Sequence, residues 1–147
     1  MNSRRDFLLK IGAGVLVSPT LQAQPVDETK QLRVALIGLG SYATRVADAM
    51  KDCKMAKLVG GVTGTPEKVE KWCLKYGLDK ANFYNYQNFD EIVKNPNIDA
   101  VYVILPNAMH HEFVIRAAKA GKHVICEKPM AVSVKESKEM RSLDLHT

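Results

Sequence analysis

The sequence predicts an α/β fold in which a doubly wound parallel sheet lies between two layers of helices. Two observations carry this prediction. Short apolar runs alternate with longer amphipathic segments from Leu32 onward, which is the pattern of βαβ units. The chain has 147 residues and is 46% hydrophobic, enough to bury one core of ordinary domain size. We therefore expect a single three-layer domain over residues 32–147.

Five apolar runs are predicted to be the strands of this sheet. They cover residues 33–37, 57–62, 83–86, 100–105 and 123–126. The runs at 33–37 and 100–105 are almost continuously apolar, which is typical of strands that are covered on both faces. These two strands are therefore expected near the centre of the sheet.

Capping residues predict where the helices begin and end. Thr65 and Pro66 start a helix that Gly77 ends, because a hydroxyl caps free N–H groups, proline suits the first turn and glycine suits the last. Two pairs with capping-box spacing start further helices. These pairs are Asn88 with Glu91 and Ser133 with Glu136, and an amphipathic segment over 110–120 ends at Gly121.

Residues 1–23 are interpreted as a signal peptide of the twin-arginine type. Arg4 and Arg5 precede an apolar stretch, residues 11–17, and a small residue, Ala23, follows at a suitable cleavage position. The apolar stretch is too short for a stable membrane-spanning helix. We therefore expect export to the periplasm, no stable membrane span, and a polar arm over residues 24–31 before the domain.

Charge and cysteine content argue against two other classes of protein. The formal net charge is +5, but lysines and arginines alternate with acidic residues along the helices, which is unlike a nucleic-acid-binding face. The three cysteines, Cys53, Cys73 and Cys126, are too widely spaced for a disulfide framework or a close pair of metal ligands. We expect neither a nucleic-acid partner nor a metal site.

The first predicted strand runs directly into a G-x-G-x-x-A motif, Gly38-Leu39-Gly40-Ser41-Tyr42-Ala43. Gly38 permits a tight turn, Gly40 lets the backbone approach a pyrophosphate, and Ala43 allows the next helix to pack closely on the strand. The amino end of that helix then offers N–H groups to phosphates. The motif therefore predicts a Rossmann domain that binds a nicotinamide dinucleotide.

The end of the second strand favours NADP over NAD. An acidic residue that holds the ribose 2′-hydroxyl is usual there in NAD-specific domains, and none is present. Thr63 offers a hydroxyl instead, and Lys68 offers a cation that suits a 2′-phosphate. The alternative is that Thr63 merely ends a strand and Lys68 is a solvated helix residue.

The fourth and fifth strands lead into residues suited to the reacting end of the cofactor. Asn107 and His110 follow the fourth strand, although His110 and His111 are equally consistent with a solvent-facing helix start. Lys128 follows the fifth strand, where a cation can orient a substrate oxygen and stabilise its developing charge during hydride transfer.

Residues 32 to about 140 resemble the glucose-fructose oxidoreductase, inositol dehydrogenase and rhizopine-catabolism (Gfo/Idh/MocA) family. Segments at 63–68 and 83–89 resemble its glucose-fructose oxidoreductase branch, whose members also leave the cytosol by the twin-arginine route. The resemblance implies that Thr63, Lys68 and Tyr86 hold the adenosine phosphate end of NADP. It also implies that Lys128 is the catalytic-site lysine. The motifs that carry the resemblance are Gly38 to Ala43, Ile104 to Asn107 with His110, and Ala120 to Ala131.

Members of this family continue into a second α/β domain that holds the sugar or polyol and supplies further catalytic residues. The resemblance implies that this chain lacks that domain and the last strand of the Rossmann sheet. Substrate binding and a family-like homo-oligomer would depend on the absent part. We therefore expect the chain alone to be inactive.

The resulting prediction is an NADP-binding domain of an oxidoreductase that moves hydride between nicotinamide and a sugar or polyol. The alternatives are an NAD-dependent polyol or inositol dehydrogenase, a truncated product that only binds dinucleotide, and, remotely, a basic nucleic-acid-binding module. The candidate catalytic residue is Lys128. The candidate cofactor-binding residues are Gly38, Leu39, Gly40, Ser41, Tyr42, Ala43, Thr63, Lys68, Tyr86, Leu105, Pro106, Asn107, His110, Glu127 and Lys128.

Overall fold

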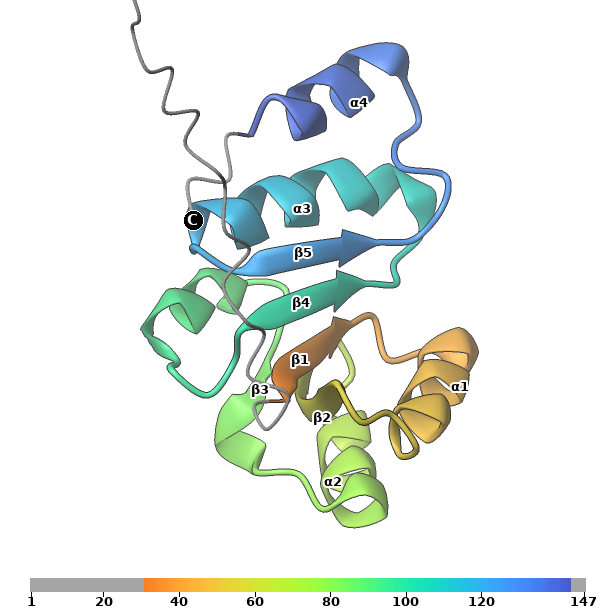
Figure 1. Cartoon of the computed structure of the whole chain (residues 1–147), viewed down its shortest axis with the longest axis vertical. Coiled ribbons are helices and arrows are strands. Elements are labelled where there is room, and N and C mark those ends of the chain that lie inside the picture. The colour runs from red at the N-terminus through yellow and green to blue at the C-terminus, as the bar shows by residue number, and fades with distance from the viewer. Residues whose placement is uncertain (1–30, 144–147) are drawn as a thin grey trace, which may run out of the picture.

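Five parallel strands form the centre of the computed structural model, which describes residues 31–143 (Figure 1). They lie in the order β3-β2-β1-β4-β5, and every neighbouring pair is parallel. The chain therefore builds outward from β1 to one edge and then fills the other side, as in a doubly wound sheet. The strands are β1 (Leu32–Ile37), β2 (Ala56–Val62), β3 (Phe83–Tyr84), β4 (Ala100–Val103) and β5 (His123–Cys126).

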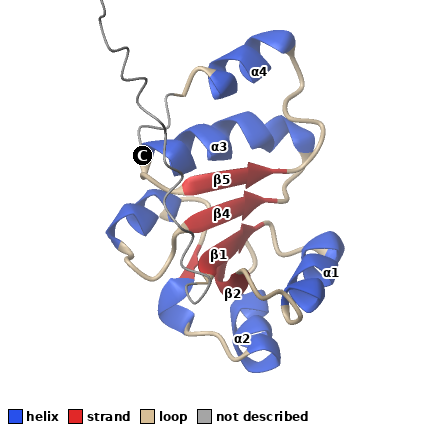
Figure 2. Cartoon of the chain, viewed as in Figure 1, coloured by secondary structure: helices blue, strands red, loops and turns tan. Residues whose placement is uncertain are grey.

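Helices cover both faces of this sheet (Figure 2). Helices α1 and α2 lie on one face, and α3 and α4 lie on the other (Figure 1). The α-helices are α1 (Ser41–Met50), α2 (Pro66–Tyr76), α3 (His110–Lys119) and α4 (Val134–Arg141). Within residues 31–143, three short 3₁₀ helices lie in the connections around the strands: η1 (Lys80–Asn82), η2 (Phe89–Lys94) and η3 (Asn107–Met109).

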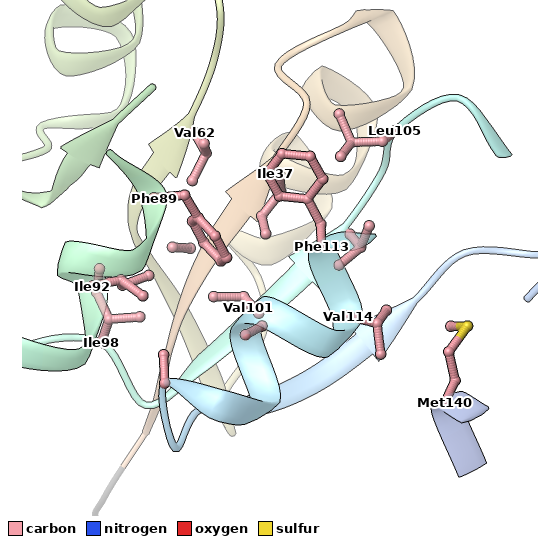
Figure 3. Close-up of a cluster of buried hydrophobic side chains, with 14 residues drawn as sticks. Ile37, Val62, Phe89, Ile92, Ile98, Val101, Leu105, Phe113, Val114 and Met140 are labelled. Carbon is pink, nitrogen blue, oxygen red and sulfur yellow. The ribbon is translucent and has the colours of Figure 1, made fainter. Parts of the chain in front are cut away.

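Two apolar cores, one on each face of the sheet, account for the three layers. Alternate residues of β1 enter different cores because side chains alternate along a strand. Val34 and Leu36 pack with residues of α1 and α2, including Trp72. Ala35 and Ile37 pack on the other side, in the larger core (Figure 3). That core also contains Phe89, Ile92, Ile98, Val101, Val103, Phe113, Val114, Ala117 and Met140.

The predicted fold class is confirmed, and the differences lie at the ends of elements. The strand predicted at 83–86 stops at Tyr84, and the one predicted at 100–105 stops at Val103. Gly77 and Gly121 have positive φ and follow helices as predicted. Ser133 also caps α4, because its Oγ accepts a hydrogen bond from the Glu136 N–H at 3.2 Å.

Two other capping predictions were wrong. Thr65 precedes α2 but makes no side-chain cap; its own N–H donates to Thr63 Oγ1 at 3.1 Å. Asn88 uses its side-chain oxygen to accept from the Asn85 N–H, and the following turn is 3₁₀ rather than α-helical. For Asn88, the turn from Asn85 competes for the side-chain oxygen that would otherwise cap the helix.

The predicted signal peptide and all but the last residue of the predicted arm lie outside the described residues, as do residues 144–147. Among residues 31–143 no helix is long and apolar enough to cross a membrane.

Candidate functional site

The candidate site follows the edge of the sheet where the parallel strands end. Strands β1, β2, β4 and β5 lead respectively into Gly38, Thr63, Ile104 and Glu127, so the predicted site residues share one edge. Figure 1 shows the arrowheads of β1, β4 and β5 pointing to this side of the molecule. Ligands of open α/β sheets bind at such an edge, where the strand order reverses.

Gly38 makes the tight turn that leaves β1. Its φ is +93°, and its N–H donates to the Val62 carbonyl at 3.0 Å. A Cβ at this position would lie 2.4 Å from the Ile104 carbonyl oxygen on the neighbouring segment. The tight turn predicted from the motif is confirmed, and both the positive φ and the close approach to Ile104 require glycine here.

Gly40 differs, because nothing lies within 4 Å of the position that its Cβ would occupy. It is the N-cap residue of α1, and its backbone is extended. No described side chain caps α1, and the first turn holds no acidic residue, so an anion can approach the free N–H groups. Ala43 is fully buried in the same core as Val34 and Leu36 of β1, which brings helix α1 close to the strand. This cradle fits a dinucleotide pyrophosphate.

Thr63 and Lys68 lie beside the glycine turn. Thr63 is buried, its N–H donates to the Tyr84 carbonyl at 3.0 Å, and its hydroxyl accepts from Thr65. The Lys68 ammonium donates to the Leu39 carbonyl at 2.9 Å, across 29 positions of sequence. The structure therefore places a half-buried cation from α2 against the turn that follows β1.

Tyr86 lies next to the same corner. Its ring would be 3.0 Å from a Cβ at Gly64, the residue after Thr63. On its other side the ring packs edge-on against Phe113 of α3, with centroids 5.4 Å apart. Tyr86 is thus anchored in the core beside the β2 end, which brings the three residues predicted for the adenosine end into one region.

The opposite end of the edge holds a pocket of about 330 Å³. Leu105 is nearly buried there, whereas Pro106 and Asn107 at the start of η3 are exposed. The pocket is lined by Tyr42, Ile104, Leu105, His110, Glu127 and Lys128. The structure thus brings Leu105, His110, Glu127 and Lys128 together with Tyr42 of α1, whereas Pro106 and Asn107 do not line this pocket.

His110 connects two of the loops that form this pocket. Its side chain is completely buried, with Nδ1 2.9 Å from the Pro129 carbonyl oxygen and Nε2 2.8 Å from the Leu105 carbonyl oxygen. The ring therefore links the loop after β4 to the loop after β5. Because both nitrogens are engaged by the chain itself, we interpret His110 as a positioning residue rather than a direct contact of the cofactor. His111 instead faces α4, where its Nε2 lies 2.8 Å from Glu139.

Glu127 is the polar centre of the pocket. Its Oε1 accepts hydrogen bonds from the Tyr42 hydroxyl, at 3.0 Å, and from the Tyr102 hydroxyl. Its Oε2 accepts from the Lys128 backbone N–H at 3.2 Å. The bonds from Tyr102 and Tyr42 hold the pKa of the Glu127 carboxyl below its usual value. The carboxylate is therefore anionic at neutral pH, while the Lys128 side chain is exposed at the rim.

Tyr102 was missed by the sequence analysis. It lies in β4 among apolar residues, so it was interpreted only as part of a buried strand. Burial, together with its hydrogen bond to the anionic Glu127, raises its pKa far above the usual value. Tyr102 is consequently a protonated donor at neutral pH. A lone hydroxyl-bearing residue in an apolar strand was the one available signal.

Among the described residues no group of three or more histidine, cysteine or acidic side chains could hold a metal ion.

The fold and this edge define a Rossmann domain that binds a nicotinamide dinucleotide. Residues 32–143 match the model of an oxidoreductase family with an NAD-binding Rossmann fold, and the chain belongs to this Gfo/Idh/MocA family.

Solved and characterised relatives agree with this assignment. The chain is 44% identical to an aldose-aldose oxidoreductase from Caulobacter crescentus, with a TM-score of 0.74 over 78% of this chain and 34% of that one. Two scyllo-inositol 2-dehydrogenases of Bacillus subtilis differ in cofactor. The NADP(+) enzyme is 31% identical over 76% of this chain and 33% of its own length. The NAD(+) enzyme is 30% identical over 74% and 31%, respectively. The chain thus spans about one third of their length.

Proposed function

We propose that this chain is the NADP-binding domain of an oxidoreductase that transfers hydride between the nicotinamide and a sugar or polyol. The observation that carries the proposal is the Lys68 ammonium against the glycine turn, at a strand end that has no acidic residue. The relatives act on aldoses and inositols by name, which supports the substrate class.

The adenosine end explains the preference for NADP. Lys68 comes from the first turn of α2 and approaches Leu39, so its charge lies beside the phosphate-binding turn. A ribose 2′-phosphate in this corner would accept a charge-assisted hydrogen bond from the Lys68 ammonium. NAD carries a 2′-hydroxyl instead, and the acidic residue that usually accepts a hydrogen bond from this hydroxyl is absent from the end of β2.

The reacting end explains the assignment of Lys128. When bound, the nicotinamide ring supplies or accepts the hydride. The exposed Lys128 ammonium at the pocket rim orients the reacting oxygen of the substrate and stabilises negative charge that develops on it. Leu105 offers an apolar wall to the same pocket, and the exposed Asn107 follows two residues later at the start of η3.

The cofactor preference is tested by titrating the 147-residue chain with NADPH and with NADH. Lys68→Ala should weaken NADPH binding by about tenfold or more, the effect of losing a hydrogen bond to a charged group, and should leave NADH nearly unchanged. Lys71→Ala removes an exposed lysine from the same helix and serves as the matched control. Equal losses for both cofactors in Lys68→Ala would remove Lys68 from the site.

An NAD-dependent polyol dehydrogenase is the second candidate, and the NAD(+)-dependent relative favours it. The two candidates differ in the wild-type titration. Tighter binding of NADH than of NADPH would select the second candidate.

A further inference from the structure

We propose that Glu127 is a positioning residue whose carboxylate couples the first turn of α1 to the loop that carries Lys128. The phosphate-binding end and the reacting end of the site would then keep a fixed relation to each other. The functional meaning of this coupling rests on the proposed dinucleotide-dependent function. The coupling itself is a property of the protein without ligand.

The contacts of Glu127 join three segments that are distant in sequence. Tyr42, 85 residues away, is the second residue of α1, and its hydroxyl donates to Oε1 at 3.0 Å. Tyr102, 25 residues away, reaches the same oxygen from β4. The other oxygen accepts from the Lys128 N–H at 3.2 Å, within the loop after β5. One carboxylate therefore holds a helix start, a strand and a loop together.

The arrangement suits a carboxylate and no other side chain of similar shape. Both oxygens act only as acceptors, and each has a donor. In Glu127→Gln the oxygen could still accept from the tyrosines, but the amide nitrogen would face the Lys128 N–H, donor against donor. Hydrogen bonds from Tyr102 and Tyr42 lower the pKa of Glu127, which keeps the acceptor form across the neutral range.

The sheet supplies a rigid reference for this coupling. Strand β4 pairs with β1 on one side and with β5 on the other, so Tyr102 belongs to the interior of the sheet. Tyr42 is 48% exposed, and Lys128 is exposed as well. Both line the same pocket of about 330 Å³, so a shift of either changes the wall that faces the nicotinamide. Glu127 therefore links the paired strand β4 to the two backbone segments that carry these exposed side chains.

Amide hydrogen exchange of the unliganded 147-residue chain tests the coupling directly. Glu127→Gln should speed exchange of the hydrogen-bonded amides of residues 44–48 in α1 and of residues 127–131, by about tenfold, the effect of one lost charge-assisted hydrogen bond. Tyr102→Phe should change the same two segments. Glu91→Gln, an exposed glutamate on η2, is the matched control. Unchanged exchange in either segment in Glu127→Gln and Tyr102→Phe would overturn the proposal.

Ligand titration then separates positioning from a purely structural role. Glu127→Gln should weaken NADPH binding by about tenfold but leave 2′,5′-ADP, which lacks the nicotinamide, within about twofold. Equal losses for both ligands, or none for NADPH, would overturn the positioning role. If the wild-type chain binds NADH instead, the cofactor proposal fails, and NADH with AMP replaces the ligand pair. If it binds neither cofactor, the exchange measurement alone decides the coupling.

Discussion

Two glycines in one turn are present for different physical reasons. Gly38 is required by the protein itself, since it has a positive φ and lies against the Ile104 carbonyl. Gly40 has open space where its Cβ would be, so the packing of the chain does not require glycine there. A dinucleotide pyrophosphate that lies against the main chain at this point does require glycine. Gly38 is therefore needed for the stability of the fold, and Gly40 is needed for binding of the ligand.

We expect Gly38→Ala to lower the free energy of unfolding by at least about 2 kcal/mol, from left-handed strain and the contact with Ile104. Gly40→Ala should change it by less than about 0.5 kcal/mol, because its site is open and extended. Urea unfolding and NADPH titration measure the two effects. Gly40→Ala should instead weaken NADPH binding by about tenfold or more.

Gly77→Ala provides the control for backbone strain alone. Its φ is +67°, and nothing lies within 4 Å of the added Cβ. A loss in Gly38→Ala no larger than in Gly77→Ala would show that the contact with Ile104 is relieved at no cost. Unaltered NADPH binding in Gly40→Ala would place the pyrophosphate elsewhere.

Three capping signals with similar sequence patterns have different outcomes at the scale of elements. Ser133 caps α4 with its side chain, whereas Thr65 and Asn88 do not cap the helices that follow them. The Asn85 N–H takes the side-chain oxygen of Asn88, whereas Thr65 stands at the N-cap position of α2 without a side-chain bond to the helix. A capping pattern thus predicts where a helix begins better than it predicts whether the capping side chain forms its hydrogen bond.

The cap matters most for α4, because this helix has 8 residues and one buried side chain, Met140. We expect Ser133→Ala to destabilise α4 by about 1 kcal/mol, the usual cost of losing an N-cap. Ser133→Asp keeps an acceptor oxygen at the same place and should retain most of the stability. Circular dichroism during urea unfolding, with amide exchange of residues 134–141, measures both variants. Equal stability of Ser133→Ala and the wild type would show that packing on α3 alone holds α4.

At the scale of the whole molecule, the site is spread along one edge of the sheet. Thr63, Lys68 and Tyr86, which we propose hold the adenosine end, lie near the β2 end. The pocket with Lys128 lies at the β4 and β5 ends, and the glycine turn after β1 lies between them. A dinucleotide is an extended ligand, and this row of strand ends matches its shape. The order β3-β2-β1-β4-β5 is what puts β1 between the two ends of the site.

We propose that the protein is exported through the twin-arginine route, on the basis of Arg4 and Arg5 before a weakly apolar stretch. A domain that acquires a dinucleotide in the cytosol must travel folded to keep it. Arg4→Lys with Arg5→Lys should leave the protein in the cytosol in a fractionation assay. Arg45→Lys with Arg141→Lys, two exposed positions in the described domain, is the control. Unchanged export of the first variant would indicate another route.

Local patterns in the sequence were enough for the fold class, the elements and the outline of the site. Alternating apolar and amphipathic segments predicted the parallel sheet, and the glycine motif predicted the tight turn at Gly38. These features depend on neighbours within a few residues, whose spacing can be read along the chain. The end of each strand also predicted which residues reach the binding edge.

The contacts that connect distant segments were decided only by the tertiary structure. Lys68 meets the Leu39 carbonyl, His110 links two loops through both ring nitrogens, and Tyr102 joins Tyr42 on Glu127. Such contacts depend on strand order, on register and on the depth to which each side chain is buried. A single sequence carries these quantities only through the complete packing of the core, so no local pattern could reveal that one carboxylate holds three segments together.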